Sequence, residues 1–369
     1  MTPTISIVIV SYNSAAQIGA CLRAVATLQF DGEQEIVVVD NASRDTSATL
    51  IQASFPHVRL LREDENYGFA GAVNRGVAAS QGEIVALLNP DAVPQPDWLQ
   101  QICAPLADAQ TGVVGSKVLG PDDRIQSVGS TLQMPVLLTA HRGDGAIDDG
   151  RYRSVEDVWS VHGAAMAFPR RVWEALGGFD DGYFPAYWEE SDFCERARRA
   201  GYRVLVAPRA VVQHHEATAT GKYSAQFYFY YHRNRLRYAA KWLDWHTLWG
   251  AFRPAERARL AGAPLLDRRV AGLAYEAGVP PLDQLGPAQR AAVLAEVEFR
   301  SRLPLVAHLR TAWNNVATRW YVRPNFERQT RANLALQRAL TALVEQTAAR
   351  SAADALDVAL LAWRLDSIG

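Results

Sequence analysis

Residues 5–13 read Ile-Ser-Ile-Val-Ile-Val-Ser-Tyr-Asn. A run of β-branched apolar residues of this length predicts a buried strand, and the polar residues after it predict a loop at the carboxyl end of that strand. Similar runs follow at Glu35–Val39, Val58–Leu61 and Ile84–Leu88, with helix-compatible stretches near 15–28, 44–54, 69–80 and 96–107. This alternation predicts an α/β fold: a Rossmann-like, mostly parallel sheet with helices on both faces.

The pattern changes twice beyond this unit. Between about 110 and 160 it is irregular, and the frequent Gly, Asp and Arg residues of 141–153 predict a mobile loop over the site. After a further strand ending near His214, the chain continues as helical stretches rich in Tyr, Trp, Arg, Ala and Leu, the last two near 325–349 and 351–365. We therefore expect an α/β domain over 1–221 and a basic α-helical C-terminal region over 222–369.

The composition is that of a globular protein, with 369 residues, 49% apolar residues, 25 Gly and 18 Pro. It excludes disordered and collagen-like chains. The formal net charge of −1 conceals a division, because residues 1–221 hold 17 Lys+Arg and 27 Asp+Glu whereas 222–369 hold 21 and 12. The basic part predicts either contact with an anionic surface such as membrane headgroups or solvated helix faces rich in Arg. We expect no nucleic acid partner.

The location and assembly of the chain are also predicted from its sequence. Three widely spaced cysteines form neither a disulfide framework nor a zinc cluster, and neither a signal peptide nor an uninterrupted apolar span of membrane length is recognisable. We expect a cytoplasmic protein. Leu336, Leu340 and Leu343 recur at helical spacing and predict packing on the α/β domain or on a second copy of the chain. Trp242 and its neighbours at 245 and 249 offer the alternative of peripheral attachment at the inner face of the membrane.

Polar residues follow three of the predicted strands. They are Ser11-Tyr12-Asn13, Asp40-Asn41-Ala42-Ser43 and Asn89-Pro90-Asp91. Ligands of parallel α/β sheets bind outside the carboxyl ends of the strands, so these loops predict a binding site. The alternative is that Ser, Asn and Asp only cap helices and form turns.

Carboxylates and histidines in these and later loops can carry chemistry. Asp91 at the mouth of the sheet suits a hard cation such as Mg²⁺ or Mn²⁺, which needs few protein ligands when it also binds phosphates. Three acids within residues 189–192, next to Trp188, raise one another's pKa and can supply a base, or else complement a helix dipole. His214 adds an imidazole that can ligate a metal or bind a diphosphate.

Taken together and in this order, these motifs resemble the inverting family 2 glycosyltransferases with the A-type fold, and more narrowly the branch with many bacterial rhamnosyltransferases. The matching residues span about 210 of the 369 and are Val10 through Asn13, Val39 through Ser43, Asn66 through Asn74, Leu88 through Asp91, Gly177 through Asp180, Tyr187 through Asp192, and His214. The C-terminal third lies outside the match.

The resemblance implies roles for individual residues. Those implied for the nucleotide-sugar donor are Ser11, Asn13, Asp40, Asn41, Asn66, Asn74 and Asn89. Asp91 matches the last carboxylate of the Asp-x-Asp metal motif, in which Asn89 replaces the first, and His214 matches a histidine near the metal and diphosphate. Glu190 matches the catalytic base, a position that more often holds Asp. Asp180, Trp188 and Glu189 fall on the acceptor side.

The implied activity is metal-dependent, inverting transfer of a sugar such as rhamnose from a nucleoside diphosphate donor to a hydroxyl of a glycan or lipid-linked acceptor. The nucleotide-sugar site and catalysis would belong to residues 1–221. Two other hypotheses are a non-catalytic scaffold of the same fold and a dinucleotide-dependent oxidoreductase. The oxidoreductase lacks support, because Ser11-Tyr12-Asn13-Ser14 stands where its Gly-x-Gly-x-x-Gly turn would follow the first strand.

Overall fold

The structure, a computed structural model, describes residues 3–215, 224–263, 265–278 and 352–366. The chain divides into two compact units, Met1–Met134 with Leu138–Phe227, and Pro135–Leu137 with Tyr228–Gly369. The predicted domain boundary at 221/222 falls within residues 216–223, which lie outside the described residues.

A ten-stranded mixed sheet forms the centre of the first unit, in the order β10-β12-β6-β11-β4-β1-β2-β3 with β5 beside β12 and β7 beside β6. Its strands are β1 (Ile5–Ser11), β2 (Gln34–Asp40), β3 (Arg59–Arg62), β4 (Ile84–Leu88), β5 (Ala92–Pro94), β6 (Thr111–Leu119), β7 (Ile125–Ser127), β10 (Glu156–Asp157), β11 (Ala165–Pro169) and β12 (Arg203–His214). The strands β4, β1, β2 and β3 are parallel neighbours, and β6 is parallel to β12. The four strands predicted before residue 90 are therefore confirmed.

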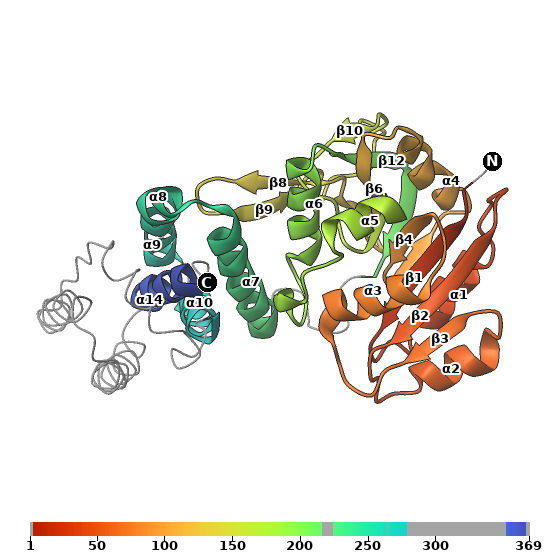
Figure 1. Cartoon of the computed structure of the whole chain (residues 1–369), viewed down its shortest axis with the longest axis horizontal. Helices are drawn as coiled ribbons and strands as arrows, with labels where there is room; N and C mark the ends of the chain where they lie inside the picture. The colour runs from red at the N-terminus through yellow and green to blue at the C-terminus, as the bar shows by residue number, and fades with distance from the viewer. Residues whose placement is uncertain (1–2, 216–223, 264, 279–351, 367–369) are drawn as a thin grey trace, which may run out of the picture. The chain divides into compact units, whose positions relative to one another are not determined.

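Helices cover both faces of this sheet, as predicted. They are α1 (Ile18–Val25), α2 (Ser47–Ser54), α3 (Gly68–Ala79), α4 (Trp98–Cys103), α5 (Arg170–Leu176) and α6 (Glu189–Arg199). Alternate residues of β1 explain the two layers: Ile7 and Ile9 pack with α1, α2 and α4, whereas Val8 packs with α3, α5 and α6. In Figure 1, α3 lies along β1 and β2.

The segment from 110 to 160 is more regular than its sequence indicated. Its longest strand, β6, is buried along its whole length and pairs with β7, β11 and β12. A separate hairpin joins β8 (Ser130–Gln133) to β9 (Leu138–His141). Residues 142–155 contain no helix or strand, but the Nζ atom of Lys117 lies 2.6 Å from Asp148 Oδ2 and the amide of Ile125 donates to the carbonyl of Ala146 at 2.9 Å. The mobility predicted for this segment stays a prediction.

The described part of the second unit is helical, in agreement with the predicted C-terminal region. It contains the end of α7 (Ala225–Trp242), then α8 (Trp245–Thr247), a π-helical turn at Leu248–Phe252, α9 (Arg253–Gly262), α10 (Leu265–Gly278) and α14 (Ala352–Asp366). Helix α10 packs on α14 (Figure 1). The helix predicted over 325–349, with its leucine repeat, lies outside the described residues. Among the helices that the structure describes, none is both long and apolar enough to cross a membrane.

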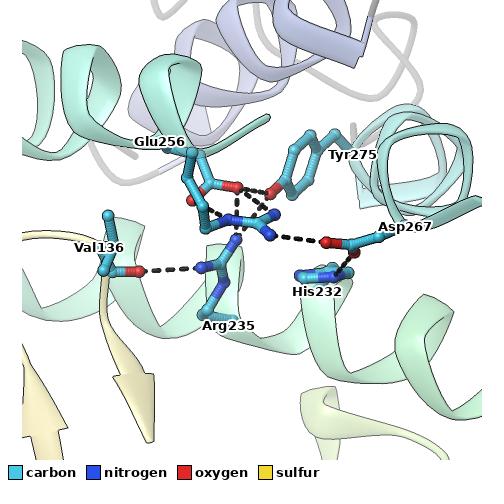
Figure 2. A network of polar contacts seen from close by, with 7 residues as sticks. Val136, His232, Arg235, Glu256, Asp267 and Tyr275 are labelled. Carbon is cyan, nitrogen blue, oxygen red and sulfur yellow. Dashed lines mark hydrogen bonds and ion pairs between the residues drawn. The ribbon is translucent and has the colours of Figure 1, made fainter. Parts of the chain in front are cut away.

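A buried ionic network joins α7, α9 and α10 (Figure 2). The fully buried guanidinium of Arg235 donates to the carbonyl of Val136 at 2.9 Å, to Glu256 Oε1 at 2.6 Å and to the hydroxyl oxygen of Tyr275 at 2.8 Å. The Tyr275 hydroxyl donates in turn to Glu256. Although burial opposes ionisation, the charge of Arg235 helps to lower the pKa of Glu256 to about 2. These helices are therefore held together by paired charge as well as by apolar contacts.

The same network continues through Arg259. Its guanidinium contacts Glu256 at 2.8 Å and Asp267 at 2.8 Å, and His232 Nε2 lies 2.8 Å from the other oxygen of Asp267. Burial lowers the pKa of His232 to about 4, so this imidazole is neutral near physiological pH. Two arginines and two carboxylates thus balance one another, and these arginines are not solvated surface charges.

Candidate functional site

Two strand ends at the carboxyl edge of the sheet carry buried oxygen atoms without partners. Ser11 and Asp40 are the last residues of β1 and β2 and lie opposite each other in the parallel register. Both are buried, and neither Ser11 Oγ nor Asp40 Oδ1 makes a hydrogen bond. Because buried polar atoms in native proteins are usually hydrogen-bonded, these two atoms indicate a place for a polar ligand.

Asn41, which the resemblance assigns to the nucleotide-sugar donor, makes three hydrogen bonds within the fold, and its contact with a donor stays a prediction. Its Nδ2 atom donates to Asn66 Oδ1 at 3.0 Å and to the carbonyl of Gly68 at 3.1 Å, while its Oδ1 accepts from the amide of Tyr67 at 2.9 Å. Asn66 Oδ1 also accepts from the amide of Gly68 at 2.8 Å. Gly68 has φ +70°, and a Cβ there would lie 2.8 Å from Phe184. The two asparagines therefore hold the strained start of α3.

Asn13 and Asn74 are also used within the fold. Asn13, at φ 52°, accepts the amide hydrogen of Arg44 at 2.8 Å, and its own amide donates to Ser43 Oγ at 2.9 Å. Asn74 exchanges two hydrogen bonds of 2.9 Å with the backbone of Phe179. A nucleotide sugar that bound the side-chain oxygen of Asn13 or Asn74 would have to share that oxygen with a backbone amide. Their direct contact with a donor stays a prediction.

Asn89, Asp91 and His214 lie together, as the resemblance implied. The pairing of β5 with β12 places His214 opposite Ala92, and the amide of His215 donates to the carbonyl of Asp91 at 3.0 Å. His214 Nε2 lies 3.2 Å from Asp91 Oδ1 and 3.5 Å from Asn89 Nδ2. The imidazole is 4% exposed and the Asp91 side chain 13%, so water screens this cluster only in part.

The Asp91 and His214 pair fits a hard divalent cation. Although His214 Nε2 and Asp91 Oδ1 lie only 3.2 Å apart, Asp91 Oδ1 is buried and makes no hydrogen bond. Adjacent ligands of an octahedral Mg²⁺ at about 2.1 Å from the ion stand about 3 Å apart, and Mg²⁺ usually keeps several waters and binds substrate phosphates. Among the described residues there is no group of three or more His, Cys, Asp or Glu side chains that could hold a metal. The pair is thus suited to a cation that also binds the substrate.

Several residues of this site carry no recognisable signal in the sequence. Gln126 hydrogen-bonds to His214 across 88 positions of the chain. The ring of His162 has its centroid 5.5 Å from that of His214 and 5.1 Å from that of His141. These side chains come from segments whose sequence pattern is irregular, so only the folded structure identifies them as neighbours of His214. An alignment of relatives would be the signal to search for.

The acid pair Glu189 and Glu190 begins α6, directly after two residues with left-handed backbone, Tyr187 at φ 78° and Trp188 at φ 80°. Such φ values are unfavourable for aromatic residues and are typical of functional sites. Burial, together with the charge of Glu190, raises the pKa of Glu189 well above its ordinary value of 4.5, and burial also raises the pKa of Glu190. Ser191 Oγ donates to Glu190 Oε1 at 3.2 Å.

One short backbone segment connects the acid pair to the cation cluster. A Cβ built on Gly163 would lie 3.6 Å from Glu190 Cγ, so the backbone of Gly163 lies directly beside the Glu190 side chain. The carbonyl of the next residue, Ala164, accepts the amide hydrogen of Asn89 at 2.8 Å. Glu190 and the Asn89–Asp91 loop therefore lie next to two consecutive residues, Gly163 and Ala164.

The remaining predicted residues lie beside this region. Trp188 is buried, with its ring against that of Trp159 at 6.2 Å between centroids, so it belongs to the core more than to an open sugar-binding face. Asp180 accepts the amide hydrogen of Gly182 at 2.9 Å and caps a short 3-10 helix, Asp181–Tyr183. Their acceptor-side roles stay predictions.

We expect the acid pair to destabilise the fold in alkaline solution. A raised pKa means that the folded state binds the proton of the carboxyl group more tightly than the unfolded chain does. This proton binding stabilises the fold fully below about pH 4.5, and the stabilisation is lost as the pH rises through the raised pKa values. Glu190→Gln should therefore raise Tm in mildly alkaline buffer, and the gain should shrink toward mildly acidic buffer. Differential scanning calorimetry across this pH range measures it.

Glu195 on the same helix is the matched control. Against the opposing effect of burial, hydrogen bonds from Arg198 and Arg199 lower its pKa. Glu195→Gln should therefore lower Tm in alkaline buffer, the opposite sign. Equal effects of the two variants on Tm would contradict the raised pKa of Glu190.

Comparison with known proteins agrees with the geometry. The model of glycosyl transferase family 2 matches residues 6–174. The N-acetylglucosaminyl-diphospho-decaprenol L-rhamnosyltransferase of Mycobacterium tuberculosis H37Rv is 26% identical over 284 residues, which cover 68% of this chain and 87% of that protein. The uncharacterized protein y4gI of Sinorhizobium fredii is 30% identical over 229 residues, 60% of this chain but only 25% of that protein.

A solved structure is similar in fold. The crystal structure of GalNAc-T7 with UDP, GalNAc and Mn²⁺ superimposes with a TM-score of 0.50 and 16% identity, covering 59% of this chain and 44% of that one. At this identity the likeness concerns the fold alone, and it agrees with the mixed, mostly parallel sheet described above. The chain therefore carries a domain over residues 6–174 that matches glycosyl transferase family 2.

Proposed function

We propose that this enzyme transfers a sugar from a nucleoside diphosphate donor to a hydroxyl of a glycan or lipid-linked acceptor, with inversion at the anomeric carbon. The observation that carries the proposal is that Glu190 lies beside Gly163 while the Asp91 loop is hydrogen-bonded to the next residue, Ala164. Inverting transfer needs a base for the acceptor on one side of the sugar and a stabiliser of the leaving group on the other. The name of the mycobacterial relative supports rhamnose as the sugar and a polyprenyl diphosphate as the acceptor carrier.

The donor would bind at the carboxyl edge of the sheet. Ser11 Oγ and Asp40 Oδ1, both buried and unpaired, would hydrogen-bond the nucleoside. Asn13, Asn41, Asn66 and Asn74 would shape the surrounding loops through the hydrogen bonds described above, and Asn89 would lie beside the diphosphate. In this proposal the catalytic domain comprises residues 1–221 and the basic helical region residues 222–369.

Asp91 and His214 would hold Mg²⁺ or Mn²⁺. Such an ion supplies positive charge that stabilises a diphosphate leaving group. The solved structure of GalNAc-T7 contains UDP and Mn²⁺ in a similar fold, which supports this choice of cation. Asn89 contributes an amide in place of the carboxylate that relatives often have, so the cation would be held weakly without the donor.

Glu190 would take the proton of the acceptor hydroxyl as the oxygen attacks the anomeric carbon. Its raised pKa makes it a stronger base than an exposed carboxylate. Glu189, whose pKa burial raises further, would remain protonated beside it and so avoid a second negative charge. Asp180 and Trp188 would lie behind the acceptor.

We place the enzyme in the cytoplasm, with its basic C-terminal region peripheral to the inner face of the membrane or in contact with a second copy of the chain. A lipid-linked acceptor would bring the enzyme to that surface. Flotation with anionic liposomes tests the membrane contact, and sedimentation of the free protein tests the dimer.

Asp91→Ala should abolish the metal-dependent part of donor binding. The wild type should be stabilised by one nucleoside diphosphate sugar only with Mg²⁺ or Mn²⁺, by about 2.7 kcal/mol at 100 times the dissociation constant. The variant should show the same small shift with and without metal. Thermal unfolding against a panel of donors measures both. Asp31→Ala, which removes an exposed carboxylate before β2 at the opposite end of the strands, is the control.

The same panel tests the proposed function as a whole. Acceptor-dependent release of a nucleoside diphosphate from the stabilising donor would support transfer. Donor binding without any release, over a range of polyprenyl and glycan acceptors, would instead indicate a non-catalytic scaffold.

A further inference from the structure

Both polar atoms of the Gln126 side chain contact the same residue, His214. Its Nε2 atom donates to the backbone carbonyl of His214 at 2.9 Å, and its Oε1 lies 3.0 Å from Nδ1 of the same residue. Gln126 belongs to β7, which pairs with β6, and β6 pairs in turn with β12. The sheet thus brings the two residues together across β6.

These two contacts determine the protonation pattern of the imidazole. A backbone carbonyl can only accept, so the NH₂ group of Gln126 must face it. The Oε1 atom then faces Nδ1, and because a carbonyl oxygen accepts, Nδ1 must carry the hydrogen. In a neutral imidazole this leaves a lone pair on Nε2, the atom that lies 3.2 Å from Asp91 Oδ1.

We propose that Gln126 is a positioning residue that holds His214 in the Nδ1–H tautomer and so presents the Nε2 lone pair to a divalent cation beside Asp91. The inference rests on the proposed function, in which these two residues hold the cation. In this tautomer Nε2 has no hydrogen to donate to Asp91 Oδ1, which is consistent with the absence of a hydrogen bond at that atom. Partners that orient metal-binding histidines typically change metal affinity about 10–100-fold when removed.

The alternative is that Gln126 only ties β7 to β12. The neighbouring residue Gln213 provides a matched control, because its Nε2 donates to Asp123 Oδ1 at 2.7 Å and links β12 to the turn before β7 without touching the imidazole. Gln126→Leu and Gln213→Leu therefore remove comparable links between the same parts of the chain, and only the first affects the tautomer.

The first measurement is the tautomer in the metal-free full-length protein. Nitrogen-15 labelled histidine distinguishes protonated from bare ring nitrogens, and His214→Ala identifies the signal. In a buffer where the imidazole is neutral, wild type and Gln213→Leu should show a protonated Nδ1, whereas Gln126→Leu should show a mixture or a protonated Nε2. A protonated Nε2 in the wild type, or no change in Gln126→Leu, would overturn the proposal.

The second measurement is Mn²⁺ binding, followed through the electron paramagnetic resonance signal of the free ion. Gln126→Leu should weaken binding about 10–100-fold, and Gln213→Leu should leave it unchanged. Gln126→Glu keeps an acceptor for Nδ1–H but loses the donor to the His214 carbonyl, and it should bind Mn²⁺ more tightly than Gln126→Leu does. Equal losses in Gln126→Glu and Gln126→Leu would overturn the tautomer explanation. A wild type with the expected tautomer but no Mn²⁺ binding would refute the proposed cation site instead.

Discussion

Glu190→Gln lowers the turnover of sugar transfer by about 10²–10⁴-fold while donor affinity is retained, because the amide fills the same space but cannot accept the acceptor's proton. The carboxylate lies in the first turn of α6 beside Gly163, and the next residue, Ala164, is hydrogen-bonded to the Asn89–Asp91 loop. Steady-state kinetics with the identified donor and acceptor, together with donor-induced thermal shifts, measure the two effects separately. In the wild type, kcat should rise with pH through the raised pKa of Glu190, since only the ionised form is a base.

Glu195→Gln serves as the control for this prediction as well, because its carboxylate lies on α6 but pairs with Arg198 and Arg199. It should change stability and leave kcat within a few-fold of the wild type. Normal turnover by Glu190→Gln would show that another group acts as the base. Glu189, its buried neighbour, would be the next residue to test.

Arg235→Met destabilises the protein by about 3–5 kcal/mol, the usual cost of removing one partner from a buried ion pair. The variant loses the hydrogen bonds to Val136 and Tyr275 and the ion pair with Glu256, which has no exposed surface. The acid would retain only Arg259 and the Tyr275 hydroxyl as partners (Figure 2). Urea unfolding of the full-length chain, followed by circular dichroism, measures the loss.

Arg257→Met on α9 is the control. Its guanidinium is 37% exposed and contacts Asp357 at 2.9 Å, so screening by water should limit the loss to about 0–1 kcal/mol. If Arg235→Met and Arg257→Met shifted the unfolding transition equally, the buried network would not be a principal source of stability in the helical unit.

The sequence by itself determined the parts of the fold that depend on local patterns. The β-branched run at Ile5–Val10 and the runs at Glu35–Val39 and Ile84–Leu88 became β1, β2 and β4, because a strand buried on both faces needs apolar side chains at consecutive positions. The run at Val58–Leu61 became β3, a partly exposed strand at the end of the sheet. The polar residues that follow these strands had to lie at one edge, since parallel strands end on the same side. For that reason Ser11, Asp40 and Asp91 could be predicted to lie at one edge of the sheet before any coordinates.

Other features were decided only by the tertiary structure. Residues 111–119 contain two glycines, a serine and a lysine, an irregular pattern for a strand, yet they form the buried strand β6, because Gly115 allows Val161 to approach closely. Asn41 and Asn74 resemble ligand-binding residues in the sequence, but backbone groups of distant segments occupy their amides. A side-chain amide forms hydrogen bonds with whichever polar groups the fold brings close to it, and the neighbouring sequence does not show which groups these are.

The same reason applies to Gln126 and Arg235. Gln126 stands among the polar residues of an irregular segment, and only the pairing of β7, β6 and β12 places it on His214. Arg235 contributes to a basic region that predicted either contact with an anionic surface or solvated helix faces, but helix packing buries it against Glu256. Apolar periodicity is a local property and can be read along the chain. The pairing of buried polar groups depends on contacts between distant residues, and only the folded structure specifies them.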